Sequence, residues 1–141
     1  MTTQQSILVY AQAIQNQLAA TVTPVPVYAN FNRNFATEPK FVTWQLRNVH
    51  QPVYTGVNQN NKGIDRPIFQ ISIYASGNTG MADAFNIANS ILQSLHGYNG
   101  QFGGVDGFYI AKADVVMLYN TYDNTVGLQQ ITMDCTLDIP T

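Results

Sequence analysis

Between residues 66 and 97, the pattern of apolar and polar positions predicts a strand, a turn and a helix in direct succession. From Phe69 to Ala75 every second side chain is apolar, which is the period of a strand with one buried face. The short run SGNTG interrupts that period and offers polar residues that can cap a helix. From Met81 to Leu95 apolar side chains recur every three or four residues, as on the buried face of a helix, and Gly97 supplies the end.

The N-terminal half of the chain predicts one more helix and two more strands. Residues 3–19 place apolar side chains on one helical face and Gln or Asn on the others. Residues 23–28 contain two prolines, which favour an extended segment at the edge of a sheet. Residues 40–50 alternate in polarity with Trp44 facing the core, and we expect this strand to pair with residues 67–75.

The C-terminal half predicts three further strands. One lies near residues 107–110, and a second spans 112–119 with four consecutive apolar residues, which is typical of a central strand covered on both faces. Residues 127–139 alternate without interruption and form the longest predicted strand. This order of elements predicts one α+β domain over residues 1–141, with a single mostly antiparallel β-sheet and two amphipathic helices packed on one face.

The segment 51–66 stands apart because it is polar, contains Gly56 and Gly63, and separates two predicted strands by more than an ordinary hairpin loop. Long connections in compact domains often carry function. We therefore treat this segment as a predicted functional loop, with a solvated mobile loop as the alternative.

Charge is scarce throughout the chain. Asp, Glu, Lys and Arg make up 10% of the residues, against roughly 25% in an ordinary soluble domain. No charged side chain precedes Arg33, so the outer face of the first helix consists of amide and hydroxyl groups. Such a face costs less to desolvate than an ionised one. The composition fits either a monomer with a neutral surface or a subunit whose surface is covered by neighbours.

Several classes of function are disfavoured. A net charge of −2 with six Lys and Arg does not provide the clustered cations of a nucleic-acid reader. The N-terminus lacks the pattern of a signal peptide and no apolar run reaches membrane-spanning length, so we expect a soluble protein made in the cytoplasm. A single cysteine, Cys135, excludes an internal disulfide and a multi-cysteine metal site.

No motif for catalysis or for a cofactor is found. Cys135 lies in the inward phase of the last predicted strand, as a small core residue does. His50 and His96 fall at the ends of predicted elements, without a neighbouring nucleophile or zinc spacing. The glycines of 97–107 follow a helix and lead into a strand, whereas a phosphate loop follows a strand and opens a helix. We expect a protein that is not an enzyme and holds no cofactor or metal.

The strand RPIFQISIYA (residues 66–75), the Gly/Asn turn, the helix 82–95 and the Gly97 stop resemble the tail terminator, or tail completion, proteins of long-tailed bacteriophages. In that family a helix precedes the sheet, as residues 3–19 would, so the order of elements agrees over nearly the whole chain. The chain departs from the family in two respects. Members commonly carry a charged residue after the turn helix and more charge in the first helix.

The resemblance implies a structural virion protein that forms a hexameric ring at the head-proximal end of the tail tube. Such a ring stops tube polymerisation and docks the tail to the head connector, and DNA passes through it without being read. The implied partners are other copies of the chain, the tail tube protein and the head–tail connector or adaptor proteins. The implied location is the neck of the virion, after synthesis in the cytoplasm of the bacterial host.

Two sets of residues are predicted to serve this assembly. In the segment 51–66, apolar and polar side chains are expected to contact a neighbouring subunit or ring; they are Tyr54, Val57, Lys62, Asp65 and Arg66. Acids on outward positions are expected to line the lumen, where like charge keeps DNA from binding. They are Asp106, Asp123 and Asp134.

Two alternatives remain at the level of sequence. Another ring-forming head–tail adaptor or a tail tube-like subunit would share the low charge and the element order. A small ferredoxin-like module that binds a ligand or nucleic acid would share the helix-and-sheet pattern. The outward Thr and Asp residues of the last strand disfavour the second alternative, because they do not form a basic or aromatic binding face.

Overall fold

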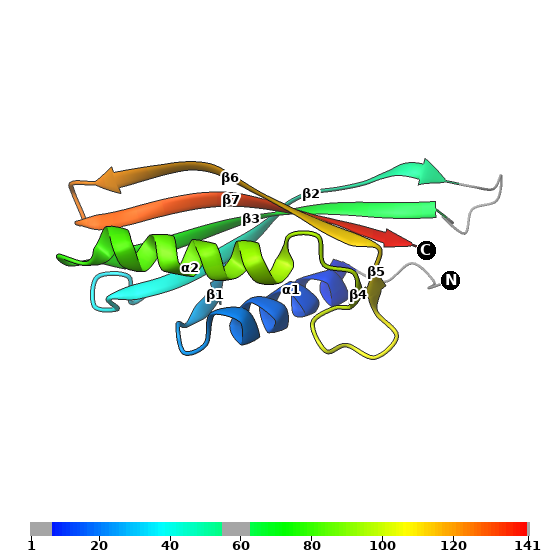
Figure 1. Cartoon of the computed structure of the whole chain (residues 1–141), viewed down its shortest axis with the longest axis horizontal. Coiled ribbons are helices and arrows are strands. Elements are labelled where there is room, and N and C mark those ends of the chain that lie inside the picture. Colours follow the sequence, from blue (N-terminus) through cyan, green and yellow to red (C-terminus); the bar gives the residue numbers. More distant parts are fainter. Residues whose placement is uncertain (1–6, 55–62, 141) are drawn as a thin grey trace.

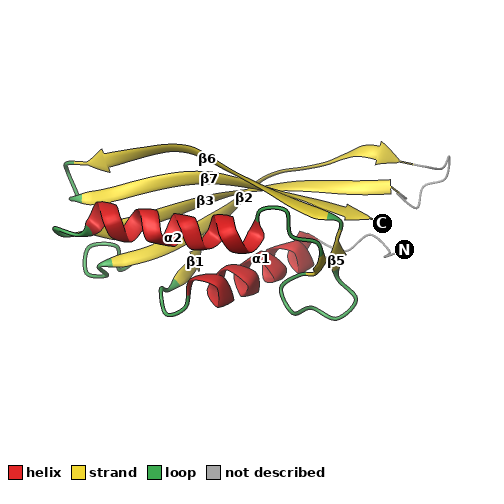
Figure 2. Cartoon of the chain, viewed as in Figure 1, coloured by secondary structure: helices red, strands yellow, loops and turns green. Residues whose placement is uncertain are grey.

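The computed structural model describes residues 7–54 and 63–140. A strongly twisted sheet forms one layer, and both helices lie against the same face of it (Figure 1, Figure 2). In chain order the elements are α1 (Ile7–Val22), β1 (Val27–Ala29), β2 (Lys40–Tyr54), β3 (Gly63–Ser76), α2 (Gly80–Leu95), β4 (Gly100–Gln101), β5 (Tyr109–Ile110), β6 (Lys112–Asp123) and β7 (Leu128–Pro140).

The main sheet has the strand order β1-β2-β3-β7-β6. The hairpins β2–β3 and β6–β7 are antiparallel, and the antiparallel ladder between β3 and β7 joins them. The short strand β1 pairs in parallel with residues 42–44 of β2. The predicted α+β class, the mostly antiparallel sheet and the pairing of residues 40–50 with 67–75 are therefore confirmed.

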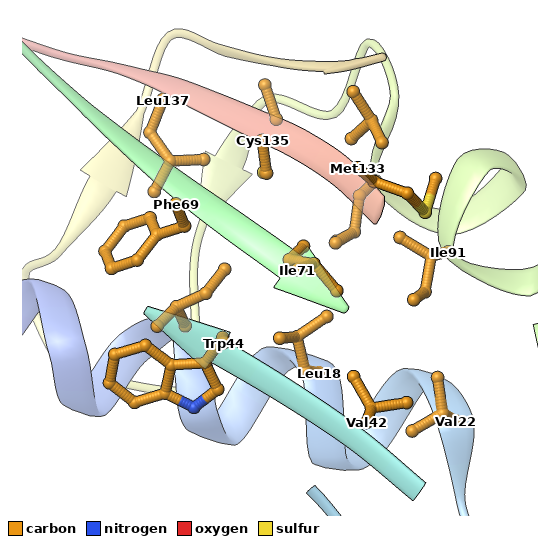
Figure 3. Close-up of a cluster of buried hydrophobic side chains, with 14 of the residues drawn as sticks. Leu18, Val22, Val42, Trp44, Phe69, Ile71, Ile91, Met133, Cys135 and Leu137 are labelled. Atoms are coloured by element: carbon orange, nitrogen blue, oxygen red, sulfur yellow. The ribbon is translucent and has the colours of Figure 1, made fainter. Parts of the chain in front are cut away.

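The core lies between the sheet and the helices (Figure 3). Trp44 of β2 and Phe69 of β3 meet edge to face, with ring centroids 5.8 Å apart. The indole N–H of Trp44 donates a hydrogen bond to Oε1 of Gln15 in α1 (2.6 Å), which pairs the one polar atom of that side chain. The other members come from the buried faces of both helices and three central strands; they include Leu18, Val22, Val42, Ile71, Ile91, Met133 and Leu137.

Strand β7 confirms the predicted alternation. Its inward side chains are all buried; they are Ile131, Met133, Cys135, Leu137 and Ile139. Burial raises the pKa of the Cys135 thiol to about 12, so the side chain stays protonated at neutral pH and behaves as a small apolar residue.

The helices match their predicted faces with one correction. The buried positions of α2 are Gly80, Ala84, Ile87, Ala88, Ile91 and Leu95. Met81 and Phe85, which the sequence pattern places on the apolar face, are 55% and 39% exposed. Ile87 is buried in their stead, because every third or fourth position from Gly80 satisfies the same periodicity.

The glycine-rich stretch after α2 folds back onto α1. Gly103 has a φ of +69°, and a Cβ atom there would lie 2.5 Å from both Cα and O of Ala13. Asn16 Nδ2 donates to the carbonyl of Gly103 (3.1 Å), and the Gly103 N–H donates to Oε1 of Gln17 (2.9 Å). The loop therefore depends on glycine both for its backbone angle and for its close approach to the helix.

Two predicted boundaries are wrong. Residues 51–66 are not a loop at either end, since β2 continues to Tyr54 and β3 begins at Gly63. The ladder is interrupted between His50 and Val53, where Pro52 has no N–H to donate, and it resumes at Val53 and Ile64. Both strands run beyond the helices (Figure 1), so no buried face imposes the apolar alternation that identifies a strand in sequence.

The prediction of a single sheet also needs a correction. The strand expected near residues 107–110 is limited to β5, and it pairs with β4 in a separate two-stranded sheet. The positive φ angles of Gly103, Gly104 and Gly107 turn the chain sharply between these two strands.

Candidate assembly surfaces

The free edge of the sheet carries an exposed apolar run. Within the described part of the chain, β7 is the one strand that pairs with β6. The other side of β6 is bonded to residues 96–98 up to Val115, and no described strand lies beside it after that point. Four consecutive side chains on it are exposed: Val116 (53%), Met117 (44%), Leu118 (46%) and Tyr119 (49%). An open strand edge with apolar side chains is a template for pairing with another strand.

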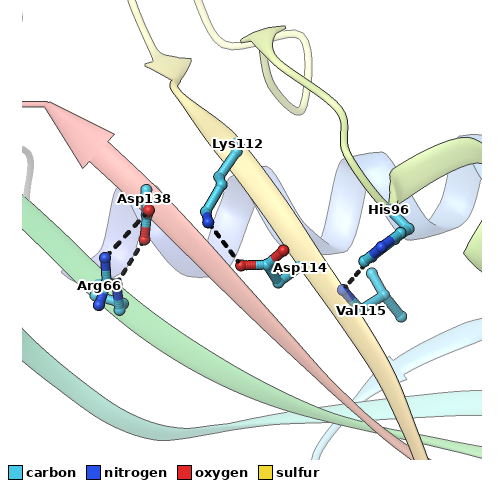
Figure 4. Close-up of polar contacts among 6 residues, drawn as sticks. All are labelled: Arg66, His96, Lys112, Asp114, Val115 and Asp138. Carbon is cyan, nitrogen blue, oxygen red and sulfur yellow. Dashed lines mark hydrogen bonds and ion pairs between the residues drawn. The ribbon is translucent and has the colours of Figure 1, made fainter.

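This position corrects the prediction that residues 112–119 form a central strand. The structure covers only the first part of β6, where Ala113 and Val115 are buried. There the end of α2 is fastened to the strand, because the Val115 N–H donates to Nδ1 of His96 (3.0 Å; Figure 4). Four consecutive apolar residues are typical of a strand that is covered on both faces, but this pattern does not indicate which strands lie beside it.

The pairing of β6 with β7 shifts by one residue between Met117 and Tyr119. Leu118 is the extra residue of this bulge. Up to Met117 the side chains that point toward the helices are Ala113, Val115 and Met117, in register with buried residues of β7. After the bulge Tyr119 lies opposite Thr132, on the face that carries no helix.

The face of the sheet opposite the helices is polar and nearly neutral. Arg47 and Asp134 form an ion pair across it (2.6 Å), and the surrounding positions carry hydroxyl and amide groups of Thr43, Gln45, Gln70, Ser72, Gln130, Thr132 and Thr136. Oδ1 of Asp134 is buried without a hydrogen-bond partner in the described part of the chain. Because Arg47 and Asp134 pair with each other, their charges on this face cancel.

One end of this open face holds an aromatic group. Phe41 and Tyr74 stack with ring centroids 4.9 Å apart, and the Tyr28 hydroxyl donates to Glu38. That hydrogen bond to the carboxylate raises the pKa of Tyr28. Phe31 and Phe35 border a cavity of about 180 Å³ beside these rings.

The opposite edge of the sheet is hollowed. A groove of about 430 Å³ runs between α1 and β1, and Trp44 lies at its base. The lining is mostly apolar or amide; its other members are Ala11, Gln12, Gln15, Asn16, Val27, Tyr28 and Ala29. None of these side chains is charged, so the groove suits an apolar occupant.

The predicted interface residues of the segment 51–66 have different placements. Tyr54 ends β2, opposite Gly63, while Val57 and Lys62 lie outside the described residues. Asp65 is 2% exposed and accepts a hydrogen bond from the Tyr10 hydroxyl (2.6 Å). Its carboxylate therefore serves the interior of the subunit and is not available to a neighbour.

Arg66 is held at the end of β3 by Asp138 of β7. Its Nε and one terminal nitrogen donate to the two carboxylate oxygens at 2.6 and 3.2 Å (Figure 4). The hydrogen bond to Asp138 raises the pKa of Arg66 further above its ordinary value. The guanidinium keeps part of its surface exposed, so it can also contribute to a polar rim.

The three predicted lumen acids are not brought to one surface. Asp134 lies on the open face of the sheet and is paired with Arg47. Asp123 is exposed at the end of β6, where its Oδ1 accepts the Thr125 N–H (2.9 Å). Asp106 is exposed in the loop between β4 and β5, whose Gly103 lies against Ala13 of α1. Their role as a set stays a prediction.

The described residues contain no group of three His, Cys, Asp or Glu side chains that could hold a metal ion. Among the same residues, neither helix has the length and apolarity needed to cross a membrane. Sequence reasoning missed the exposed apolar run of β6 as a surface, although the four consecutive apolar residues were its signal.

No family model matches the sequence, and no curated protein matches it. Solved structures do share its fold. One protein of 12% identity superposes with a TM-score of 0.67 over 98% of both chains. A chain from the virion of a native gene transfer agent particle is 16% identical, with a TM-score of 0.60 over 94% of this chain and 92% of that one.

A third structure is the sheath/tube terminator of an extracellular contractile injection system, PVC, in its extended state. It is 10% identical and has a TM-score of 0.53 over 98% of this chain and 57% of that chain. This chain shares its fold with that part of the sheath/tube terminator. The resemblance to tail terminators that residues 66–97 carry is thereby confirmed at the level of the fold. At 10% to 16% identity few side chains are shared, so the likeness lies in the order and packing of the elements.

Proposed function

We propose that this protein is a tail terminator, which forms a hexameric ring on the head-proximal end of a tail tube. The ring stops polymerisation of the tube and presents its other side to the head–tail connector. The observation that carries the proposal is the terminator fold, which extends over 98% of this chain. The proposed location is accordingly the neck of a virion, and the proposed site of synthesis is the bacterial cytoplasm.

The surfaces of the subunit support a role in assembly. A cyclic ring needs two different complementary surfaces on each subunit. The structure offers an apolar free edge at β6 and an uncharged groove between α1 and β1, on opposite sides of the sheet. The helical face of α1 carries no charge, which lowers the cost of covering it.

DNA is proposed to pass through the ring without being read. The chain has six Lys and Arg against eight Asp and Glu. On the face of the sheet opposite the helices, Arg47 is already paired with Asp134. Tight binding would require several unpaired cations that displace counterions from the phosphates, and the described surface does not gather them.

The test is to add the purified protein to polymerising tail tube subunits and to examine both by negative-stain electron microscopy. We expect closed rings of one diameter in the protein alone, and tubes that stop growing with a ring at one end when both are present. Tubes that elongate unchanged would contradict the proposal. A protein that stacks into long tubes by itself would identify a tube-like subunit, and rings that bind only connector would identify an adaptor.

A further inference from the structure

At both edges of the sheet, side chains between the helices and the sheet are left uncovered. At one edge they lie between α2 and the part of β6 beyond Val115, where residues 96–98 no longer bond to the strand. At the other edge they line the groove between α1 and β1, with Trp44 at its base. A heterologous contact between copies needs two such unlike surfaces.

The outer flank of α2 carries exposed apolar side chains. Asp83 and Ser90 line a cavity beside the end of α1, so that flank of α2 faces the other helix. Because a helix turns about 100° per residue, Met81 and Phe85 lie on the opposite flank, where they are 55% and 39% exposed. The same flank ends at His96, whose ring accepts a hydrogen bond from β6.

Strand β6 adds two exposed side chains beside this flank. Met117 and Tyr122 lie on the face of the sheet that carries the helices, and they are 44% and 53% exposed. The partner of Tyr122 in β7 is Gln129, whose Cγ would lie 3.7 Å from a Cβ on Gly80 at the start of α2. We call the four exposed residues on the two elements the α2–β6 surface; they are Met81, Phe85, Met117 and Tyr122.

The α2–β6 surface and the groove lie at the same level of the sheet. Reading across the ladders from β6 to β1, one row contains Met117, Met133, Ile71, Trp44 and Ala29. Directly paired residues share a face of the sheet, so Met117 and Ala29 lie on the helical face at opposite edges. Rotation about an axis along the strands brings these two positions to one level in neighbouring copies.

The edge of β1 favours contact through side chains over the pairing of strands. The carbonyl of Val27 accepts a hydrogen bond from Nε2 of Gln15 (3.0 Å), and the carbonyl of Ala29 accepts the Phe31 N–H (2.7 Å). These two carbonyls are therefore already bonded within the subunit. Oε1 of Gln15 also accepts the indole N–H of Trp44, which fixes the base of the groove for an apolar side chain.

Charge is compatible with this contact. Neither the lining of the groove nor the α2–β6 surface contains a charged residue, so covering them dehydrates no ion. Beyond the apolar region, Lys40 shares a row with Tyr122 through Ala75 and Gln129, and Asp123 follows Tyr122. The same rotation therefore brings this acid to the level of the lysine in the next copy, where opposite charges attract.

We propose that the α2–β6 surface of one subunit packs into the α1–β1 groove of the next, with Met117 against Ala29 and Trp44 of the neighbouring copy. This inference rests on the ring proposed above and names the surfaces that close it. It gives the exposed apolar side chains of α2 and β6 a cover that the subunit itself lacks.

The first test is charge rescue, measured by size-exclusion chromatography with light scattering. Met117→Lys and Ala29→Asp each place one charge in an apolar contact, and we expect each to reduce the ring to monomers with an unchanged circular dichroism spectrum. The double variant pairs the two charges across the contact and is expected to restore the ring. A ring that survives either single substitution would overturn the proposal.

The control for these variants is Tyr109→Lys. Tyr109 of β5 is 50% exposed and lies outside both surfaces, so this variant is expected to keep the ring. Loss of the ring in the control as well would show that any added lysine prevents assembly, and it would remove the support that Met117→Lys gives.

The second test is cross-linking with a short bis-maleimide, which native Cys135 does not disturb because it is buried. The double variant Met117→Cys/Ala29→Cys is expected to give a ladder of covalent oligomers. Mixed rings of the two single variants are expected to give covalent dimers only, since each copy then carries one new thiol. Dimers from Met117→Cys alone would show contact between two β6 strands and would contradict the head-to-tail arrangement.

The outcomes separate this proposal from the function proposed above. A wild-type protein that remains monomeric would refute the ring and the contact together. Wild-type rings that cap tubes, combined with Met117→Lys and Ala29→Asp variants that also form rings, would refute the contact alone. Rings that pass both tests but do not cap tubes would support the contact and refute the terminator function.

Discussion

At the scale of single residues, a few buried positions hold the fold together through contacts that are specific to their residue type. Gly103 combines a left-handed backbone with contact to Ala13 of α1. Asp65 and Tyr10 pair in the interior although they are far apart in sequence. Cys135 fills the centre of β7 as an un-ionised thiol. Each of these residues holds the scaffold, and none is exposed for assembly.

Gly103→Ala is expected to destabilise the protein strongly. The left-handed backbone costs an L-residue about 1–2 kcal/mol, and the new Cβ would require α1 to move away from the loop. Gly104→Ala is the matched control, because its φ is +67° and no atom lies within 4 Å of the position of a Cβ. Urea denaturation should place Gly103→Ala at least about 2 kcal/mol below Gly104→Ala. Equal losses would show that contact with α1 carries no energy.

The thiol of Cys135 predicts a dependence of stability on pH. Its pKa is raised from 9.0 to about 12 by burial, so the folded state retains a proton that the unfolded state releases above about pH 9. The stabilisation by the neutral thiol is complete below pH 9 and is lost as the pH rises toward 12. Between pH 8 and 10 the free energy of unfolding should fall by about 1 kcal/mol more in the wild type than in Cys135→Ala.

Urea titrations of both proteins at the two pH values measure that difference, and ionisation of the tyrosines cancels because both proteins contain them. A pH dependence that is identical in the two proteins would contradict the assignment to Cys135.

At the scale of elements, the sequence predicts well where a strand or helix has one buried face. The elements β3, α2 and β7 are examples, since alternate or fourth-residue apolar positions face one core. The ends of β2 and β3 were missed because they extend beyond the helices, where no buried face leaves a pattern. The position of β6 at the edge of the sheet was not predicted, because apolar residues on both faces of a strand do not indicate which strands lie beside it.

The candidate surfaces were predictable to a smaller extent. Low charge indicated association, but the assignment to particular residues depended on long-range packing. Asp65 shows the difficulty, because its partner Tyr10 lies on α1 and nothing near residue 65 in sequence indicates that contact. Conversely, the apolar run of residues 115–118 was visible in sequence, and only the fold shows that its residues 116–118 are exposed in the subunit.

Two ion pairs across the sheet are expected to differ in strength. Arg66 and Asp138 join β3 to β7 through two hydrogen bonds, with side chains 35% and 10% exposed. Arg47 and Asp134 form one hydrogen bond and are 44% and 18% exposed. Double-mutant cycles with Arg→Gln and Asp→Asn should give a coupling energy above about 1 kcal/mol for the first pair and below it for the second. The reverse order would contradict the geometric argument.

At the scale of the whole molecule, the low content of charged residues determines how tightly the protein can bind DNA. At 0.15 M salt we expect no binding of the assembled ring to duplex DNA tighter than about 10⁻⁴ M, measured by fluorescence anisotropy.

If Asp123 lines the lumen, Asp123→Asn should raise the affinity of the ring for DNA at low salt several-fold. Asp83→Asn is the control of equal charge, since Asp83 lies in the first turn of α2. Equal effects of both variants would remove Asp123 from the lumen.

The ladder between β3 and β7 has a kinetic consequence for the subunit. It pairs residues as far apart in sequence as Ile64 and Pro140, whereas β2–β3 and β6–β7 are hairpins between neighbours in sequence. Short-range contacts form early in folding, and contacts across long stretches of chain form slowly because closing a long loop costs entropy. We therefore expect the two hairpins to form before they join, with the docking of β3 on β7 as the slow step in producing subunits that can assemble.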